Sequence, residues 1–266
     1  MKCEGMKVDA IIRAKLKEIE QREQVRIIWA VEAGSRAWGF SSPNSDYDVR
    51  FIYVRDPKEY LRLEEIRDSI DAQQDDLLDM EGWDLRRVLR LVYRSTPEVH
   101  EWFASPTIYR STPEGLELQK ILPEYFSVKK CARNYLHTAS LDFRTYFRDD
   151  EVWQIKYFYL LRQMLLANWL LEEGSMPPML FEELVKRKLD EQWKDYILEL
   201  LQEKRATSEL GKAQRNKKLI DYIEQSISRM DEDVSALKDE EKKSWEMLNQ
   251  YFYSVLKNEV YHREEI

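Results

Sequence analysis

Two short apolar runs in the first quarter of the chain have the length and composition of buried strands. Residues 25–31 are rich in Val and Ile, and a second run extends from Tyr47 to Val54. Both runs are shorter than a typical helix, and β-branched and aromatic side chains favour the pleated surface of a sheet. We therefore expect two strands of one sheet, separated by the polar stretch 34–46.

Helical periodicity begins before these strands. Residues 8–21 carry apolar side chains at helical spacing, namely Ile11, Ile12, Leu16 and Ile19. Charged residues occupy the other face, so this helix should pack on the sheet. Further along, the pattern predicts a short helix capped by Asp56, one or two strands within residues 66–84, helices over 84–94 and 96–102, and an extended piece at 105–109.

Nearly every later segment has helical spacing. The predicted helices cover residues 127–147, 152–172, 180–189, 193–203, 212–230 and 237–262. The last of them gathers Trp245, Leu248, Phe252 and Val255 on one face, which favours burial in a core over an oligomer seam. We expect an α+β domain over residues 1–122, with a small mixed sheet and helices on one side, followed by an all-α domain over residues 123–266.

Composition and charge narrow the class of protein. The chain has 266 residues, of which 43% are hydrophobic, enough to fill a core, and only 7 Gly and 8 Pro, which favours a mostly helical soluble protein. Its net charge of −8 argues against a protein that coats nucleic acid nonspecifically, so any RNA contact must be local. A monomer is favoured.

The chain carries no pattern typical of secretion or membrane insertion. The two cysteines, Cys3 and Cys131, lack zinc-type spacing, and the N-terminus lacks the architecture of a signal peptide. The most apolar run, 157–171, is interrupted by Arg162 and other polar residues. We therefore expect a reduced, cytoplasmic protein with no membrane segment.

Two aspartates at the start of the second strand are candidate metal ligands. Side chains alternate across a strand, so Asp46 and Asp48 should point to one face while Tyr47 points to the other. Two carboxylates so close repel unless a cation neutralises them, and hard oxygen ligands suit Mg²⁺ or Mn²⁺. The alternative is a surface turn with two solvated aspartates.

The turn after the first strand is a candidate phosphate cradle. Gly34 lets the backbone approach a ligand closely, and the amides and hydroxyl of Gly34 and Ser35 can hold phosphate oxygens. Arg36 adds a positive charge beside them. The turn and the aspartates together predict a site for a nucleotide and a metal.

These motifs resemble those of a known family. Gly34-Ser35, ten intervening residues and then Asp46-Tyr47-Asp48-Val49 fit the signature of the DNA polymerase beta nucleotidyltransferase superfamily. The longer strings Gly-Ser-Arg-Ala-Trp-Gly-Phe from Gly34 and Ser-Asp-Tyr-Asp-Val-Arg-Phe-Ile-Tyr from Ser45 are similar to those of RlaP-like predicted nucleotidyltransferases, which are associated with RNA repair. The likeness extends through 82–86 and 101–106, and more weakly through 156–162.

The resemblance implies an activity and further site residues. It implies a metal-dependent enzyme that transfers a nucleoside monophosphate from a nucleoside triphosphate to a hydroxyl acceptor and releases pyrophosphate, with two metals held by Asp46 and Asp48. It also points to Asp84 as a third carboxylate, with Glu81 or Asp79 as substitutes. The alternative role for Asp84 is to cap the following helix.

Two cations of the predicted helix 152–172 are candidate phosphate ligands. Lys156 and Arg162 lie on an otherwise apolar, aromatic helix, and a cation on its buried side needs a partner. They could reach the triphosphate across a cleft between the two domains. The alternative is a lysine that extends toward solvent and an arginine in a structural ion pair.

The acceptor and the role of the histidines stay open in the sequence. An RNA 3′ end, a protein side chain and a small alcohol are all compatible acceptors, and a non-catalytic nucleotide-binding sensor or interaction protein is the alternative function. His100, His137 and His262 form no zinc or Ser-His-Asp arrangement. A core or surface role is expected for each, with His137 the most open to a function.

Overall fold

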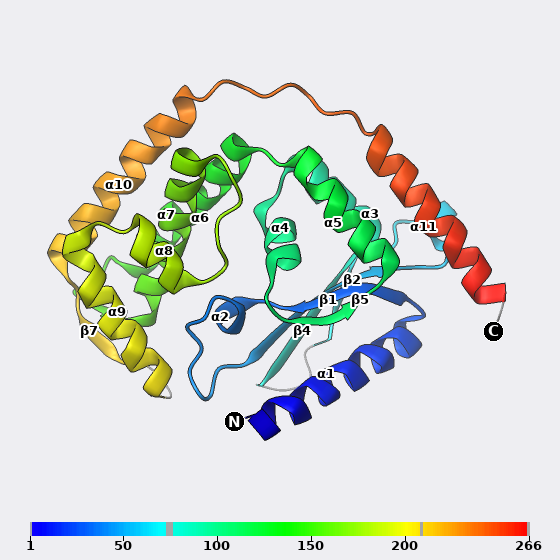
Figure 1. Cartoon of the computed structure of the whole chain (residues 1–266), viewed down its shortest axis with the longest axis horizontal. Coiled ribbons are helices and arrows are strands. Elements are labelled where there is room, and N and C mark those ends of the chain that lie inside the picture. The colour runs from blue at the N-terminus through cyan, green and yellow to red at the C-terminus, as the bar shows by residue number, and fades with distance from the viewer. Residues whose placement is uncertain (1, 73–76, 208–209, 265–266) are drawn as a thin grey trace.

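The computed structural model describes residues 2–72, 77–207 and 210–264 (Figure 1). A five-stranded sheet forms its first half, in the order β3-β4-β2-β1-β5. The strands are β1 (Arg26–Glu32), β2 (Tyr47–Val54), β3 (Ser69–Asp71), β4 (Leu78–Asp84) and β5 (Ile108–Ser111). Strands β2 and β4 are parallel and the other neighbours are antiparallel, so the sheet is mixed, as predicted.

Helices cover both faces of this sheet. Helix α1 (Lys2–Glu23) packs on one face, while α3 (Leu85–Arg94), α4 (Pro97–Ala104) and α5 (Pro113–Tyr125) pack on the other (Figure 1). The expectation of helices on one side was wrong. Strand β2 directs Phe51 toward α1 and Ile52 toward α3–α5, and both side chains are fully buried, so each face needs an apolar cover.

The later helices share a separate core. They are α6 (Val128–Tyr146), α7 (Ile155–Glu173), α8 (Phe181–Lys188), α9 (Glu191–Ala206) and α10 (Lys217–Ala236). Helix α7 is buried nearly all round and lies at the centre of this core. A two-stranded ribbon, β6 (Glu151–Trp153) and β7 (Lys212–Gln214), replaces the first residues of two predicted helices, because three-residue strands are too short to show an alternating pattern.

The last helix returns to the sheet. Helix α11 (Glu246–Glu264) begins nine residues later than the predicted helix 237–262 and packs Leu248, Tyr251 and Val255 against α3 and α5. Burial of Leu248 and Val255 was expected, whereas Phe252 is only partly buried and Trp245, which precedes the helix, is 40% exposed. The division into 1–122 and 123–266 stays a prediction; α5 runs through residues 122 and 123, and α11 packs with the first part rather than the second.

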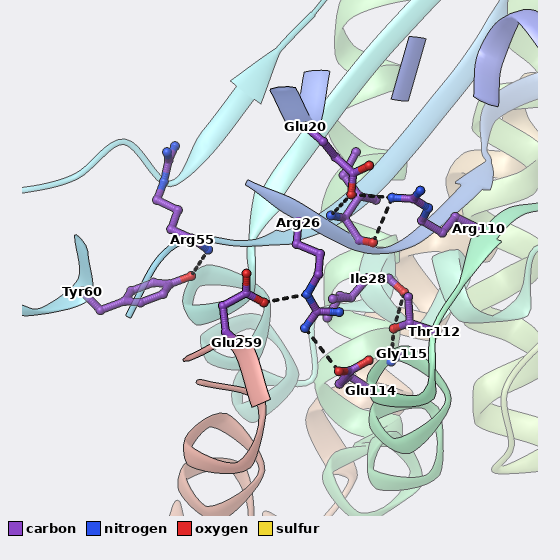
Figure 2. Close-up of polar contacts among 11 residues, drawn as sticks. Glu20, Arg26, Ile28, Arg55, Tyr60, Arg110, Thr112, Glu114, Gly115 and Glu259 are labelled. Atoms are coloured by element: carbon purple, nitrogen blue, oxygen red, sulfur yellow. Dashed lines mark hydrogen bonds and ion pairs between the residues drawn. The ribbon is translucent and has the colours of Figure 1, made fainter. Parts of the chain in front are cut away.

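A buried ion network fastens α11 to the sheet (Figure 2). Arg26 of β1 donates to Glu259 of α11 at 2.6 Å and to Glu114 of α5 at 3.2 Å. The hydroxyl of Thr112 donates to the Ile28 carbonyl and caps α5 by accepting from the Gly115 amide. These contacts join three segments that are far apart in the sequence.

The predicted short helix after Asp56 is the 3₁₀ turn η1 (Glu59–Leu61).

Across the described ranges, no helix combines the length and the hydropathy that crossing a bilayer would require.

Candidate active site at the ends of strands β1 and β2

A pocket of about 310 Å³ lies where the end of β1, the short helix α2 (Gly34–Ala37) and the start of β2 face α4 and α7. From the sheet side it is lined by Glu32, Ala33, Gly34, Ser35, Asp46, Asp48 and Arg50, and from the opposite side by Trp38, Glu98, Glu101, Trp102, Tyr159 and Met179. The structure therefore brings the predicted glycine-serine turn and both predicted aspartates into one pocket.

Gly34 is needed here for two reasons. Its φ of +58° lies in the left-handed region, which residues other than glycine rarely adopt. A Cβ at this position would lie 1.8 Å from Oδ2 of Asp48, far inside van der Waals contact. The carboxylate of Asp48 thus packs directly on the Gly34 backbone, and any other residue at 34 would displace it.

The ionised form of Asp48 is energetically unfavourable in this environment. Burial, together with the nearby charge of Asp46, raises its pKa to about 6, while Arg50 opposes the rise. Arg50 Nη2 lies 3.4 Å from Asp48 and 2.8 Å from Asp79. A cation bound between the aspartates would relieve the repulsion that raises this pKa.

Arg36 stabilises the loop that delivers the aspartates. Its guanidinium donates to the carbonyls of Ser45 and Asp46 at 2.6 and 2.9 Å and lies over the ring of Tyr47 at 3.7 Å. The residue does not line the pocket. Its expected contact with phosphate stays a prediction, whereas its contacts in this structure fix the approach to β2.

Glu32 is a site residue that the sequence reasoning missed. Its side chain is buried, accepts the Asp48 amide at 3.1 Å through Oε1 and accepts the Tyr109 hydroxyl through Oε2. Burial raises its pKa to about 7, against the lowering effect of these two hydrogen bonds. An acid that ends an otherwise apolar strand next to the glycine-serine turn was the signal available in the sequence.

Replacing Glu32 with Gln should stabilise the metal-free protein at pH 8 and do so much less at pH 5. A carboxyl whose folded pKa lies above its unfolded value binds more protons when folded, so stability falls as the pH rises from about 4.5 to about 7. Glutamine cannot ionise, so the variant does not lose this stability. We expect the difference in the free energy of unfolding to be on the order of 2 kcal/mol. Denaturant unfolding at both pH values measures the difference.

The control for this variant is Glu18→Gln, on the exposed face of α1. It should show no such pH-dependent gain. An equal gain for Glu32→Gln at pH 5 and pH 8 would contradict the ionisation of a buried Glu32.

Asp84 lies away from the two aspartates. It pairs in register with Tyr53, whereas Asp79 pairs with Asp48, so Asp84 is five residues, roughly 16 Å, farther along the strand. Its buried carboxylate accepts from the Arg86 amide at 2.8 Å and from the Tyr60 hydroxyl at 2.9 Å. Its position corrects the expectation of a third metal ligand, because the carboxylate is occupied in capping α3.

The two substitutes for Asp84 lie on the same strand face as Asp48. Asp79 lies opposite Asp48 and shares Arg50 with it. Glu81 pairs in register with Arg50, two residues beyond Asp79 on β4, and its carboxylate accepts the indole N–H of Trp83 at 2.8 Å. Asp79 is therefore the better placed of the two.

Neither Lys156 nor Arg162 lines the pocket. Lys156 Nζ lies over the ring of Tyr146 at 3.9 Å. Arg162 is 1% exposed and donates to Glu101 of α4 at 3.0 Å. Its guanidinium also lies 4.1 Å from the ring of Trp38, so it stands directly behind the wall of the pocket that Glu101 and Trp38 form.

The histidines and cysteines lie elsewhere. His137 lines a separate cavity of about 500 Å³ between α6 and α10, and His100 is a buried residue of α4 that lines another pocket. Cys131 is a free, buried thiol, whereas the side chains of Cys3 and His262 lie outside the described residues. None of the described ones lines the candidate active site.

A family model that matches most of the chain agrees with the motif. Residues 8–254 match the family model RlaP, described as RNA repair pathway DNA polymerase beta family. An uncharacterized protein of Bacillus subtilis, YcgL, is 39% identical over 237 residues, which cover 88% of this chain and 91% of that protein. A nucleotidyltransferase-like protein of Exiguobacterium sibiricum has a TM-score of 0.32 at 12% identity, over 85% of this chain and 75% of the other.

Proposed function

We propose, from the premise that this chain belongs to the RlaP family of DNA polymerase beta-like proteins, that it transfers a nucleoside monophosphate from a nucleoside triphosphate to a hydroxyl acceptor. The acceptor oxygen bonds to the α-phosphorus, the bond from that phosphorus to the bridging oxygen breaks, and pyrophosphate leaves. The contact of the Asp48 carboxylate with Gly34, in one pocket with Ser35 and Asp46, supports the proposal best.

The donor set of the pocket fits a divalent metal. Within the described ranges no three His, Cys, Asp or Glu residues form a complete metal cage. Mg²⁺ does not need one, because it commonly takes one or two carboxylates and completes its shell with substrate phosphates and water. Asp46 and Asp48 would hold it, and when bound it would neutralise charge on the reacting phosphate and activate the acceptor hydroxyl.

The protein itself would bind and orient the nucleotide. The Gly34 and Ser35 backbone and the Ser35 hydroxyl would hold the outer phosphates. The described part of the chain supplies no hydrogen bond to that hydroxyl, which leaves it available in the pocket. Trp38, Trp102 and Tyr159 give the opposite wall aromatic faces on which a base can stack.

Transfer itself is the direct test. Purified protein is incubated with each α-³²P-labelled nucleoside triphosphate, Mg²⁺ or Mn²⁺, and three acceptors in turn: an RNA with a free 3′ hydroxyl, a protein lysate and an aminoglycoside alcohol. We expect label on one acceptor class and equimolar pyrophosphate. The RNA is tested first because the family description links it to RNA repair. Metal-dependent protection by nucleotide in a thermal melt, without transfer to any acceptor, would favour a nucleotide sensor instead.

Asp79→Asn should lower turnover on the order of 100-fold while nucleotide still binds, because Asp79 is the carboxylate that lies beside Asp48. Asp84→Asn is the matched control on the same strand. Asparagine caps a helix almost as well as aspartate, so this variant should keep near-normal turnover. Steady-state rates and nucleotide affinities of the two variants distinguish the roles. The opposite pattern, with turnover lost only in Asp84→Asn, would restore the original assignment.

A further inference from the structure

A second pocket lies on the other side of α4. Its volume is about 360 Å³, and it lies between α4, α5 and the turn that follows α7. Apolar side chains form most of its walls, namely Phe103, Ala104, Leu122, Pro123, Phe126 and Met176. This size and lining fall in the range of pockets that bind small molecules.

One buried polar group in this pocket has no partner. His100 is 5% exposed, and its Nε2 makes no hydrogen bond in the described structure. The rings of His100 and Phe126 pack in a T-shaped arrangement, with centroids 5.4 Å apart. Burial lowers the pKa of His100 to about 4, so the ring is neutral and offers one N–H and one lone pair. Buried polar groups are nearly always paired, so an unpaired one that lines a pocket points to a missing ligand.

The lining also restricts the charge of that ligand. Among the described residues that line the pocket, none carries a charge, so neither an anion nor a cation would find a counter-ion. The polar groups other than His100 are Gln119, whose amide donates to the Phe103 carbonyl at 3.1 Å, and Ser175, whose hydroxyl accepts the indole N–H of Trp169 at 3.4 Å. Both of these groups already have a protein partner, whereas Nε2 of His100 has none among the described residues, so His100 is the group we assign to ligand selection.

We propose that this pocket binds a small, planar, uncharged and largely apolar molecule whose single hydrogen-bonding group pairs with the imidazole of His100. The rings of Phe103 and Phe126 supply the apolar surface for such a molecule. Because Nε2 is itself buried, this binding requires side chains at the pocket wall to move and admit the ligand's hydrogen-bonding group.

The position of the pocket couples it to the candidate active site. His100 lines the second pocket, and its chain neighbour Glu101 lines the catalytic one. The turn after α7 likewise contributes Met176 to the second pocket and Met179 to the catalytic one, where Met179 Sδ lies 3.7 Å from the Arg162 guanidinium. A ligand that shifts α4 or this turn changes the nucleotide pocket. This coupling rests on the proposed function, whereas binding beside His100 does not.

Indole and indene test binding, because they share a shape and only indole has an N–H. The chain has only 3 His, so their imidazole Cε1–H resonances can be assigned by single substitutions and followed in a titration of the full-length protein. We expect indole to shift the His100 resonance saturably and to leave His137 unmoved. Isothermal titration should show indole binding about five- to tenfold more tightly than indene, the value of one hydrogen bond.

Two variants complete this test. His100→Phe keeps a ring but removes the polar atom, so it should abolish the preference for indole over indene. Ala104→Leu fills the pocket and should weaken both probes, and His137→Phe, in the other cavity, should change neither. Equal binding of the two probes by the wild type, or shifts spread evenly over all three histidines, would overturn the proposal.

The coupling has its own readout. Linkage requires that indole changes the affinity for a magnesium nucleoside triphosphate by the same factor as the nucleotide changes the affinity for indole. We expect a factor of about five or more in wild type and a factor near one in Ala104→Leu. Tight nucleotide binding that indole leaves unchanged would refute the coupling. Absence of any nucleotide binding would refute the proposed function, while the His100 shift would still decide the pocket.

Discussion

Asp46→Asn and Asp48→Asn should each lower nucleotidyl transfer by on the order of 1,000-fold or more while the protein stays folded. Each substitution removes one of the two negative charges that would hold the metal but almost no volume. The carboxylate of Asp48 packs against Gly34, and the neutral amide of asparagine has nearly the same volume and fits the same space. Loss of activity without loss of structure is therefore the expected signature.

Metal-free stability provides the independent check on this prediction. Because burial and Asp46 raise the pKa of Asp48, its ionised form is costly at neutral pH, and Asp48→Asn should raise the melting temperature in the absence of metal. Added Mg²⁺ with nucleotide should stabilise the wild type and not the variant. Asp195→Asn, at an exposed position of α9, is the matched control and should behave as wild type. Full activity in either site variant would remove metal-assisted transfer from consideration.

Arg162→Met should destabilise the protein by about 3–5 kcal/mol, the cost of breaking a buried ion pair by removing one partner. The guanidinium is buried against Trp38 and Glu101, and Glu101 would lose its cation while it still accepts the Tyr135 hydroxyl at 2.7 Å. Urea unfolding measures the loss. Adding Glu101→Gln to Arg162→Met should recover part of the stability, because no unpaired charge then remains buried.

Nucleotide affinity separates the two roles considered for Arg162. If it is structural, the ratio of triphosphate to monophosphate affinity should stay within about twofold of wild type in the folded variant. Lys156→Met is the control, since Lys156 lies over the rings of Tyr146 at 3.9 Å and Tyr159 at 5.5 Å, and each such cation–π contact is worth on the order of 1 kcal/mol. A tenfold fall in that ratio for Arg162→Met alone would show that Arg162 binds the outer phosphates after all.

Local pattern was enough where the determining contacts are close in sequence. The strand predicted from Tyr47 to Val54 is β2 with the same bounds, and the helix predicted over 84–94 is α3, which begins one residue after its cap. The spacing of β-branched and apolar residues is set within a few positions, so periodicity could reveal both. Gly34 and Asp48 belong to one continuous segment of the chain, in which the connection through α2 between the adjacent strands β1 and β2 brings them together.

Contacts between distant segments were not predictable in this way. Arg162 and Glu101 are 61 residues apart, and nothing in either local pattern identifies the other as its partner. The helical character of the last segment was predicted, but its return to the sheet depends on Arg26 and Glu259, which are 233 residues apart. The sequence also could not predict that both faces of β2 are buried, because this depends on which helices pack against the sheet.

The sequence by itself determined that the chain has a strand, a glycine-serine turn and a second strand with one aspartate just before it and one near its start, because each of these depends on neighbouring residues. Only the tertiary structure decided which other carboxylates accompany them. The parallel register of β2 with β4 puts Asp79 rather than Asp84 opposite Asp48, and a shift of a few residues would change that pairing. Glu32 became a site residue for the same reason: its burial and its bond to the Asp48 amide arise only when the strands pair.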